Sequence, residues 1–187
     1  MMRKIKIFLL ALILSSFLSN YTFAQSKIQE KNVIITYTWN HIQTHGSNQI
    51  AIWIEDIKGN YICTLFATKF TTEGGYIKRP LSLSEWTAKF DIKNASKEDI
   101  DAITGATPQS GQQSITWNCK DKSNKAIPAG TYIVRMEANI CDADKMFFKG
   151  EIKIGGNTQQ TIGEITYSNP SLSNGNTLFK EVLVEYK

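Results

Sequence analysis

A strand–turn–strand pattern fills the stretch Gln49-Ile-Ala-Ile-Trp-Ile-Glu-Asp-Ile-Lys-Gly-Asn-Tyr-Ile-Cys-Thr-Leu-Phe-Ala67. Isoleucine occupies every second position from 50 to 54, while Ala51, Trp53 and Glu55 point the other way, which is the period of a β-strand. Lys58-Gly59-Asn60 supplies a turn, and the β-branched and aromatic residues that follow favour a second strand. The stretch therefore predicts a β-hairpin.

Further short stretches on both sides of this hairpin have the same character. They are rich in β-branched and aromatic residues and are bounded by Gly, Asn, Ser or Pro. The candidate strands are Val33–Trp39, Ser114–Asn118, Ile127–Glu137, Met146–Ile154, Gly163–Tyr167 and Leu178–Tyr186. We expect the second and third of these to form another hairpin, and residues 157–162 and 168–176 to be exposed loops.

Two stretches between these strands favour helix. Leu81–Phe90 is compatible with a short helix capped by Ser82 or Ser84, and Ser96 with Asp99 loosely matches a capping box. Many short strands with turns between them indicate a sandwich. We predict an all-β fold, an immunoglobulin-like antiparallel β-sandwich with one or two short helical turns, as a single domain over residues 25–187.

The segment Trp117-Asn-Cys-Lys-Asp-Lys-Ser-Asn-Lys-Ala-Ile-Pro-Ala-Gly-Thr-Tyr-Ile-Val134 resembles a hairpin of immunoglobulin-like domains such as that of the flagellar hook-capping protein. Together with the hairpin at 49–67, Arg79-Pro-Leu and Asp101–Pro108, it is similar to a predicted periplasmic family, the domain of unknown function DUF2271. The resemblance covers roughly residues 30–155 and implies a periplasmic setting without an established activity. Asn118-Cys119 departs from the family, which usually has Asp-Gly there.

The segment Asp101-Ala-Ile-Thr-Gly-Ala-Thr107 resembles the acceptor motif for covalent flavin attachment, Asp-x-x-(Ser/Thr)-Gly-Ala-(Ser/Thr). In proteins with that motif, an exported flavin transferase moves the FMN half of FAD onto the last hydroxyl. The resemblance implies that Thr107 is the nucleophile and carries FMN, while the transferase supplies the base and the phosphate clamp.

The other residues of the motif have roles that follow from their chemistry. Gly105 and Ala106 allow a diphosphate and a bulky enzyme to approach the backbone closely. Asp101 and Thr104 are expected to hold the turn through side-chain-to-backbone hydrogen bonds, or to contact the transferase. The purely structural alternative is a capped helix that ends in Gly105 and is followed by a proline-led approach to the next strand.

Residues 1–24 predict a signal peptide. Arg3, Lys4 and Lys6 precede an apolar run from Ile7 to Leu18, and Thr22-Phe23-Ala24 suits cleavage after Ala24. Without the three basic residues of this segment, 18 basic and 17 acidic residues remain, a net charge of +1. We therefore expect a periplasmic or secreted protein that has no membrane span after cleavage and no field to attract nucleic acid.

The remaining candidates for chemistry are weaker. His41 and His45 lie between strands without a convincing third ligand, so no metal site is predicted. Cys63, Cys119 and Cys141 form no Cys-x-x-Cys pair, and buried apolar cysteines are the favoured interpretation, although Cys63 could pair with either of the others. Since no arrangement of acid, base and nucleophile is visible, we expect no catalytic residues.

Two functions remain open on the sequence. One is an electron-transfer carrier whose FMN, attached by a flavin transferase, serves envelope redox proteins. The other is a non-catalytic immunoglobulin-like domain that binds a protein or polysaccharide of the cell envelope and exposes an apolar or aromatic patch on a sheet face.

Overall fold

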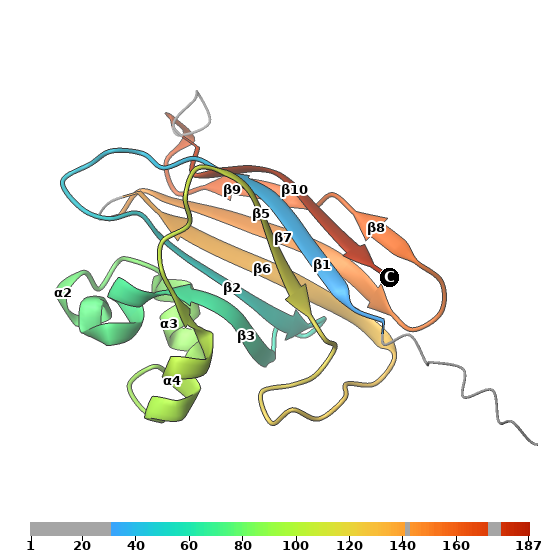
Figure 1. The fold of residues 1–187 in the computed structure, drawn as a ribbon. Coiled ribbons are helices and arrows are strands. Elements are labelled where there is room, and N and C mark those ends of the chain that lie inside the picture. The colour runs from blue at the N-terminus through green and yellow to red at the C-terminus, as the bar shows by residue number, and fades with distance from the viewer. Residues whose placement is uncertain (1–30, 141–142, 172–176) are drawn as a thin grey trace, which may run out of the picture. The chain divides into compact units, whose positions relative to one another are not determined.

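The computed structural model describes residues 31–140, 143–171 and 177–187, and residues 31–187 form one compact unit. The predicted signal peptide at residues 1–24 and Cys141 lie outside the described residues. Within the described chain, two β-sheets face each other (Figure 1). The prediction of an all-β sandwich is confirmed.

The first sheet has four strands and the second has six. In spatial order, the first sheet contains β5 (Gly111–Trp117), β1 (Val33–Trp39), β10 (Phe179–Tyr186) and β8 (Gln159–Thr161). The second contains β4 (Thr104–Gly105), β3 (Tyr61–Thr68), β2 (Gln49–Asp56), β6 (Gly130–Asn139), β7 (Lys145–Ile154) and β9 (Glu164–Tyr167). All neighbouring strands are antiparallel except β3 and β4, which are parallel.

The core between the sheets follows from the period of two along the strands. On β1, Val33, Ile35, Tyr37 and Trp39 are buried and alternate with half-buried residues. The opposite sheet contributes the isoleucines at 50, 52 and 54, all fully buried. Side chains of this size each gain roughly 1.5–3 kcal/mol from burial, so this alternation fixes the register of both sheets.

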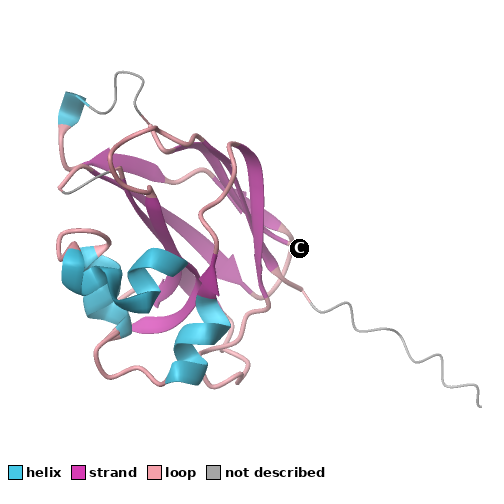
Figure 2. Ribbon diagram, turned by 60° about the vertical axis from the view of Figure 1, so that its left-hand side comes forward, coloured by secondary structure: helices cyan, strands magenta, loops and turns pink. Residues whose placement is uncertain are grey.

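Strand β2 is buried on both faces, unlike a strand in a sheet whose outer face is exposed to solvent. Ala51 and Trp53 are fully buried on the face turned away from the first sheet. Helices cover this outer face of the second sheet (Figure 2). They belong to the segment between β3 and β5: η2 (Thr71–Gly75), α2 (Tyr76–Lys78), α3 (Ser84–Phe90) and α4 (Lys97–Ile103). The sequence predicted only one or two helical turns here.

A second, smaller core forms beneath these helices. Trp53 and Trp86 are fully buried in it, and the rings of Trp86 and Phe90 stack with their centroids 5.2 Å apart. The indole nitrogen of Trp86 donates to Thr64 Oγ1 at 2.9 Å. Because α3 is short, this packing holds it in place rather than its intrinsic helix propensity.

The N-terminus of α3 is capped by tertiary structure and not by a serine. Its N-cap residue is Leu83, in a left-handed conformation without a side-chain cap. The carboxylate of Glu137, on β6, accepts from the Trp86 backbone N–H at 2.9 Å and from Lys145 Nζ at 3.1 Å. The prediction of Ser82 or Ser84 as cap was wrong because a buried carboxylate on the sheet satisfies the helix instead.

The second predicted hairpin was also wrong. Strand β5 pairs with β1 in one sheet, whereas β6 pairs with β2 and β7 in the other. The connection between them crosses from sheet to sheet and makes a single bridge between Lys120 and Ala126. Trp117 still meets Tyr132, edge to face at 5.8 Å, but across the core. Cys119 in this connection has φ of +57°, which explains why glycine suits the position.

One predicted loop contains a strand, because Gln159–Thr161 forms β8 and pairs with the end of β10. Among the described residues, no helix is both long and apolar enough to cross a lipid bilayer.

Burial raises the pKa of Glu137 above its ordinary value, against the opposing effects of the Trp86 N–H and Lys145. The folded state therefore holds this proton more tightly than the unfolded state does. The corresponding stability is present below the unfolded pKa of about 4.3 and is lost as the pH rises through the raised folded pKa.

We predict that Glu137→Gln, which cannot ionise, escapes this loss. Urea unfolding of both proteins at pH 4 and pH 7 measures the difference in unfolding free energy between variant and wild type. The loss of the carboxylate oxygen costs the variant the same free energy at both pH values. Relative to the wild type, the unfolding free energy of the variant should therefore be higher at pH 7 than at pH 4. A gap that stays constant or shifts toward the wild type would contradict the raised pKa.

Candidate functional site

Residues 101–103 form the last turn of helix α4, and residues 104 and 105 then pair with the edge of β3. The helix begins as predicted, with Ser96 Oγ accepting from the Asp99 backbone N–H at 3.1 Å. It ends at Ile103, and the chain then extends as β4, which pairs in parallel with Ala67 and Thr68 of β3. Gly105 thus lies in a strand and does not terminate the helix, contrary to the structural alternative.

Thr104 anchors the segment to its surroundings. Its hydroxyl is hydrogen-bonded to the carbonyl oxygen of Ile100 at 2.7 Å and to the hydroxyl of Thr72 at 2.9 Å. One bond reaches back into α4 and the other crosses to η2. The predicted side-chain-to-backbone bond of Thr104 is therefore present, and it fixes the direction in which the chain leaves the helix.

Gly105 is required by close packing against an aromatic ring. A Cβ atom added at this position would lie 2.3 Å from Cε2 of Phe66, on β3. No real Cβ contact is this short, so any larger residue would displace the ring. The small residue brings the backbone of 104–106 down onto the sheet.

Thr107 lies just beyond this anchored turn, after the exposed Ala106. Thr107 is half-buried. Its hydroxyl donates to the carbonyl oxygen of Asn48 at 3.4 Å, a long and therefore weak hydrogen bond. Asn48 itself is fully buried; its side chain accepts from Ile42 N at 2.8 Å and donates to Ile140 O at 3.2 Å. The residue whose carbonyl the Thr107 hydroxyl contacts is thus held rigidly, whereas the hydroxyl itself is only weakly hydrogen-bonded.

Asp101 is exposed on the last turn of α4, and its carboxylate makes no hydrogen bond or ion pair among the residues that the structure describes. It does not hold the turn. A contact with an approaching enzyme remains the role open to it.

A layer of buried polar side chains, which the sequence did not reveal, underlies the motif. The hydroxyls of Thr68 and Thr71 both bond to Oε1 of Gln49, at 2.6 Å and 3.0 Å. Gln49 and Thr68 are fully buried, as is Thr71. These bonds connect β2, β3 and η2 directly beneath the segment that carries Thr104 and Thr107.

The loop that contains both histidines lies next to the motif. The backbone N–H of His41 donates to Ser110 Oγ at 2.9 Å. Among the described residues, no group of three or more His, Cys, Asp or Glu side chains comes together as a metal site would require.

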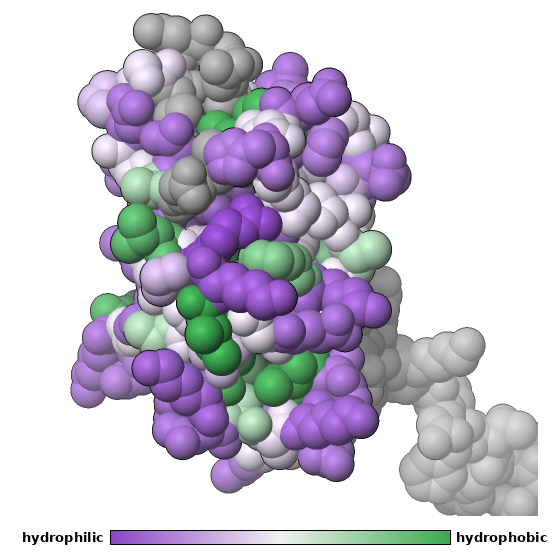
Figure 3. Space-filling model, turned by 90° about the vertical axis from the view of Figure 1, so that its left-hand side faces the viewer, coloured by the Kyte–Doolittle hydropathy of each residue, from purple (hydrophilic) through white to green (hydrophobic). Residues whose placement is uncertain are grey.

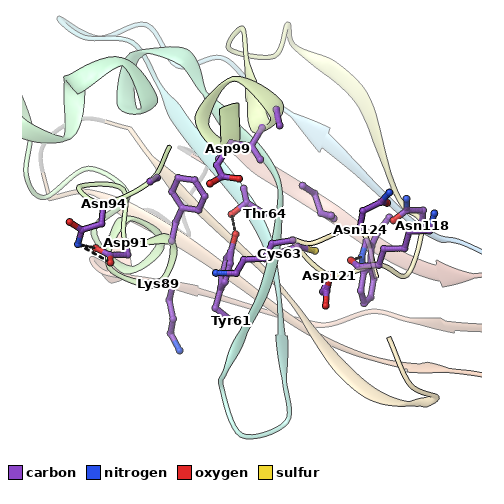
Figure 4. A pocket seen from close by; sticks show the side chains of 18 residues that line it. Tyr61, Cys63, Thr64, Lys89, Asp91, Asn94, Asp99, Asn118, Asp121 and Asn124 are labelled. Atoms are coloured by element: carbon purple, nitrogen blue, oxygen red, sulfur yellow. Dashed lines mark hydrogen bonds between the residues drawn. The ribbon is translucent and has the colours of Figure 1, made fainter. Parts of the chain in front are cut away.

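A cavity of about 440 Å³ opens on the other side of α4, between β3, the helices and the 118–124 connection (Figure 4). Tyr61 and Thr64, both on β3 in its wall, are hydrogen-bonded to each other at 2.9 Å, and the sulfur of Cys63 points toward the connection. Burial raises the pKa of Cys63 to about 12, and the negative charge of Asp121 adds to the effect. The thiolate is therefore disfavoured at neutral pH, and Cys63 is no nucleophile there.

The family of predicted periplasmic proteins DUF2271 has a model that matches residues 31–168. Neither a curated protein nor a solved structure matches the chain.

The different engagement of the two threonine hydroxyls gives a prediction. Thr104→Val removes two good hydrogen bonds at constant shape and should lower the unfolding free energy by about 1–2 kcal/mol. Thr107→Val removes only one weak bond and should change it by less than about 0.5 kcal/mol. Urea unfolding of both variants beside the wild type measures the difference. Equal costs would refute the division between an anchoring and a free hydroxyl.

Proposed function

The chain belongs to the DUF2271 family of predicted periplasmic proteins, and from this premise we propose that it is an electron-transfer carrier with FMN attached to Thr107 by a flavin transferase. The observation that carries the proposal is the contrast between Thr104 and Thr107. The first hydroxyl is tied into the fold by two hydrogen bonds, and the second makes one long bond of 3.4 Å beside the exposed Ala106.

The residues around Thr107 suit a phosphoester acceptor. Its hydroxyl oxygen accepts no hydrogen bond from a described residue, so its lone pairs are available for attack. Ala106 adds no bulk in front of it, and Gly105 keeps the backbone close to the sheet. The carbonyl of Asn48 orients the hydroxyl but is too weak a base to activate it, which leaves that task to the transferase.

The attachment transfers the FMN half of FAD to the Thr107 hydroxyl through its phosphorus atom. The Thr107 oxygen forms a bond to the phosphorus next to riboflavin in FAD, and the pyrophosphate bond to AMP breaks. The hydroxyl proton leaves to a base of the transferase, and AMP is the leaving group. Once bound, FMN supplies reversible electron transfer. The chain's own residues hold the acceptor in place and take no part in that redox chemistry.

The sandwich suits the role of a rigid mount. Thr107 is the next but one residue after β4, and β4 is the edge strand of the six-stranded sheet, paired with β3. The acceptor therefore moves with the sheet and not with a free loop. A carrier that docks with envelope redox proteins gains from such a fixed attachment point.

A non-catalytic binding domain is the second candidate, and exposed apolar residues favour it. Ile77 and Leu81 are 71% and 54% exposed, and Ile77 lines a hollow of about 490 Å³ between α2 and α3. Figure 3 shows hydrophobic side chains among polar ones on this helical side. These residues lie over the helices and not on a sheet face, where the sequence interpretation expected a patch.

We predict that the mature protein, purified from an envelope that contains a flavin transferase, carries the mass of one FMN less one water. Thr107→Ala should abolish the addition. Ser110→Ala is the matched control, because it removes a neighbouring exposed hydroxyl and should keep the flavin. Intact-mass spectrometry reads all three proteins.

Two outcomes would count against the proposal. One is an unmodified wild-type chain from cells whose transferase loads another acceptor. The other is a flavin that persists on Thr107→Ala, which would place the attachment elsewhere.

A further inference from the structure

Arg79 is held against Ser47 and the Phe70 ring with its guanidinium in a fixed orientation. It follows α2 directly and is half-buried. The guanidinium carbon lies 4.1 Å from the centre of the Phe70 ring, a stacked cation–π arrangement. Nη1 donates to Ser47 O and Nη2 to Ser47 Oγ, both at 3.3 Å.

The guanidinium also lies close to the backbone of residue 46. A Cβ atom at Gly46 would come within 2.9 Å of Nη1. Glycine at position 46 therefore leaves room for the guanidinium next to the chain. A cation stacked in this way has lost much of its rotamer freedom before any ligand binds.

This positive charge is not neutralised. Among the described residues, no carboxylate lies within 4 Å of the Arg79 guanidinium, whereas Arg135, the other half-buried arginine, bonds to Glu85 at 2.9 Å. Arg79 uses two of its five donors in long bonds to Ser47 and leaves the rest for another partner. An oriented, unpaired guanidinium suits an anion, and phosphate oxygens match its fork.

Arg79 and Thr107 contact consecutive residues of one strand entry. Arg79 bonds to Ser47, and the Thr107 hydroxyl bonds to the carbonyl of Asn48. Adjacent Cα atoms are only 3.80 Å apart, so the two side chains approach the same short piece of backbone. Figure 1 shows the start of β2, the segment after α4 and the region of α2 gathered at one end of the second sheet.

We propose that Arg79 is a phosphate-binding residue for the phosphodiester that joins FMN to Thr107, an inference that rests on the proposed function. That phosphodiester carries one negative charge at every physiological pH. Binding it gives the Arg79 guanidinium the counter-charge that the protein itself does not provide. The same contact helps Thr107 during the transfer, because negative charge on the attacked phosphorus group is then stabilised.

The test compares single-substitution variants of the protein before and after flavin loading. Wild type, Arg79→Gln, Arg79→Lys and Lys78→Gln are treated with a flavin transferase and FAD, and intact mass follows the loading with time. Thermal unfolding midpoints are then measured before and after loading. Lys78→Gln is the matched control, because Lys78 is the neighbouring cation, is exposed on α2 and makes no contact with Ser47.

We expect loading to raise the midpoint of the wild type and of Lys78→Gln by about 2–4 °C more than that of Arg79→Gln. Since each variant is compared with its own unloaded form, the lost contacts to Ser47 and Phe70 cancel. The extra rise should shrink in high salt and be partly kept by Arg79→Lys. Loading of Arg79→Gln should be slower by about tenfold or more, and a folded Arg79→Gln that cannot be loaded at all also supports the proposal.

Equal loading rates and equal midpoint shifts in wild type and Arg79→Gln would overturn the role of Arg79 while the flavin proposal stands. A wild-type chain that stays unmodified, beside a control acceptor that the same transferase loads, would overturn both.

Discussion

The double burial of β2 is the constraint on which the rest of the structure depends. A strand with isoleucine on one face and Ala51 and Trp53 on the other needs cover on both sides, since each exposed large side chain would forfeit roughly 1.5–3 kcal/mol. The first sheet covers the isoleucine face. The chain between β3 and β5 covers the other with short helices, packed through Trp86 and tied to the sheet by the carboxylate of Glu137.

The same helical segment between β3 and β5 also positions the candidate acceptor, Thr107. After covering Trp53, the chain must return to the first sheet to form β5, and it does so along the free edge of β3 as the short parallel strand β4. Thr104 and Gly105 serve this return path, through hydrogen bonds in one case and close packing on Phe66 in the other. Thr107 lies beyond this return path, and its hydroxyl makes only one long hydrogen bond to the rest of the fold. A motif whose last hydroxyl is spare is what modification by another protein requires.

The charged and titratable groups in the buried interior differ from those near Thr107. The buried charges are paired: Glu137 faces Lys145, and Arg135 lies near Glu55 and Glu85. The buried thiol of Cys63 and the phenol of Tyr61 have raised pKa values and stay neutral at physiological pH. No described group near Thr107 is prepared to act as its base, in agreement with chemistry supplied from outside. Arg79 is the exception, a half-buried cation that is oriented but not neutralised among the described residues.

The sequence by itself determined the strands, the sandwich, the capped helix at Ser96 and the motif at 101–107, because side-chain period, turn residues and caps act over a few neighbouring residues. It also predicted the periplasmic family. Only the tertiary structure decided that β5 and β6 belong to different sheets, that Glu137 caps α3, and that Thr72 and Asn48 bond to Thr104 and Thr107. These contacts join residues distant in the chain, from 32 to 59 positions apart around Thr104 and Thr107. Burial and hydrogen bonding between such residues depend on how the sheets and helices pack, and no local pattern encodes that packing.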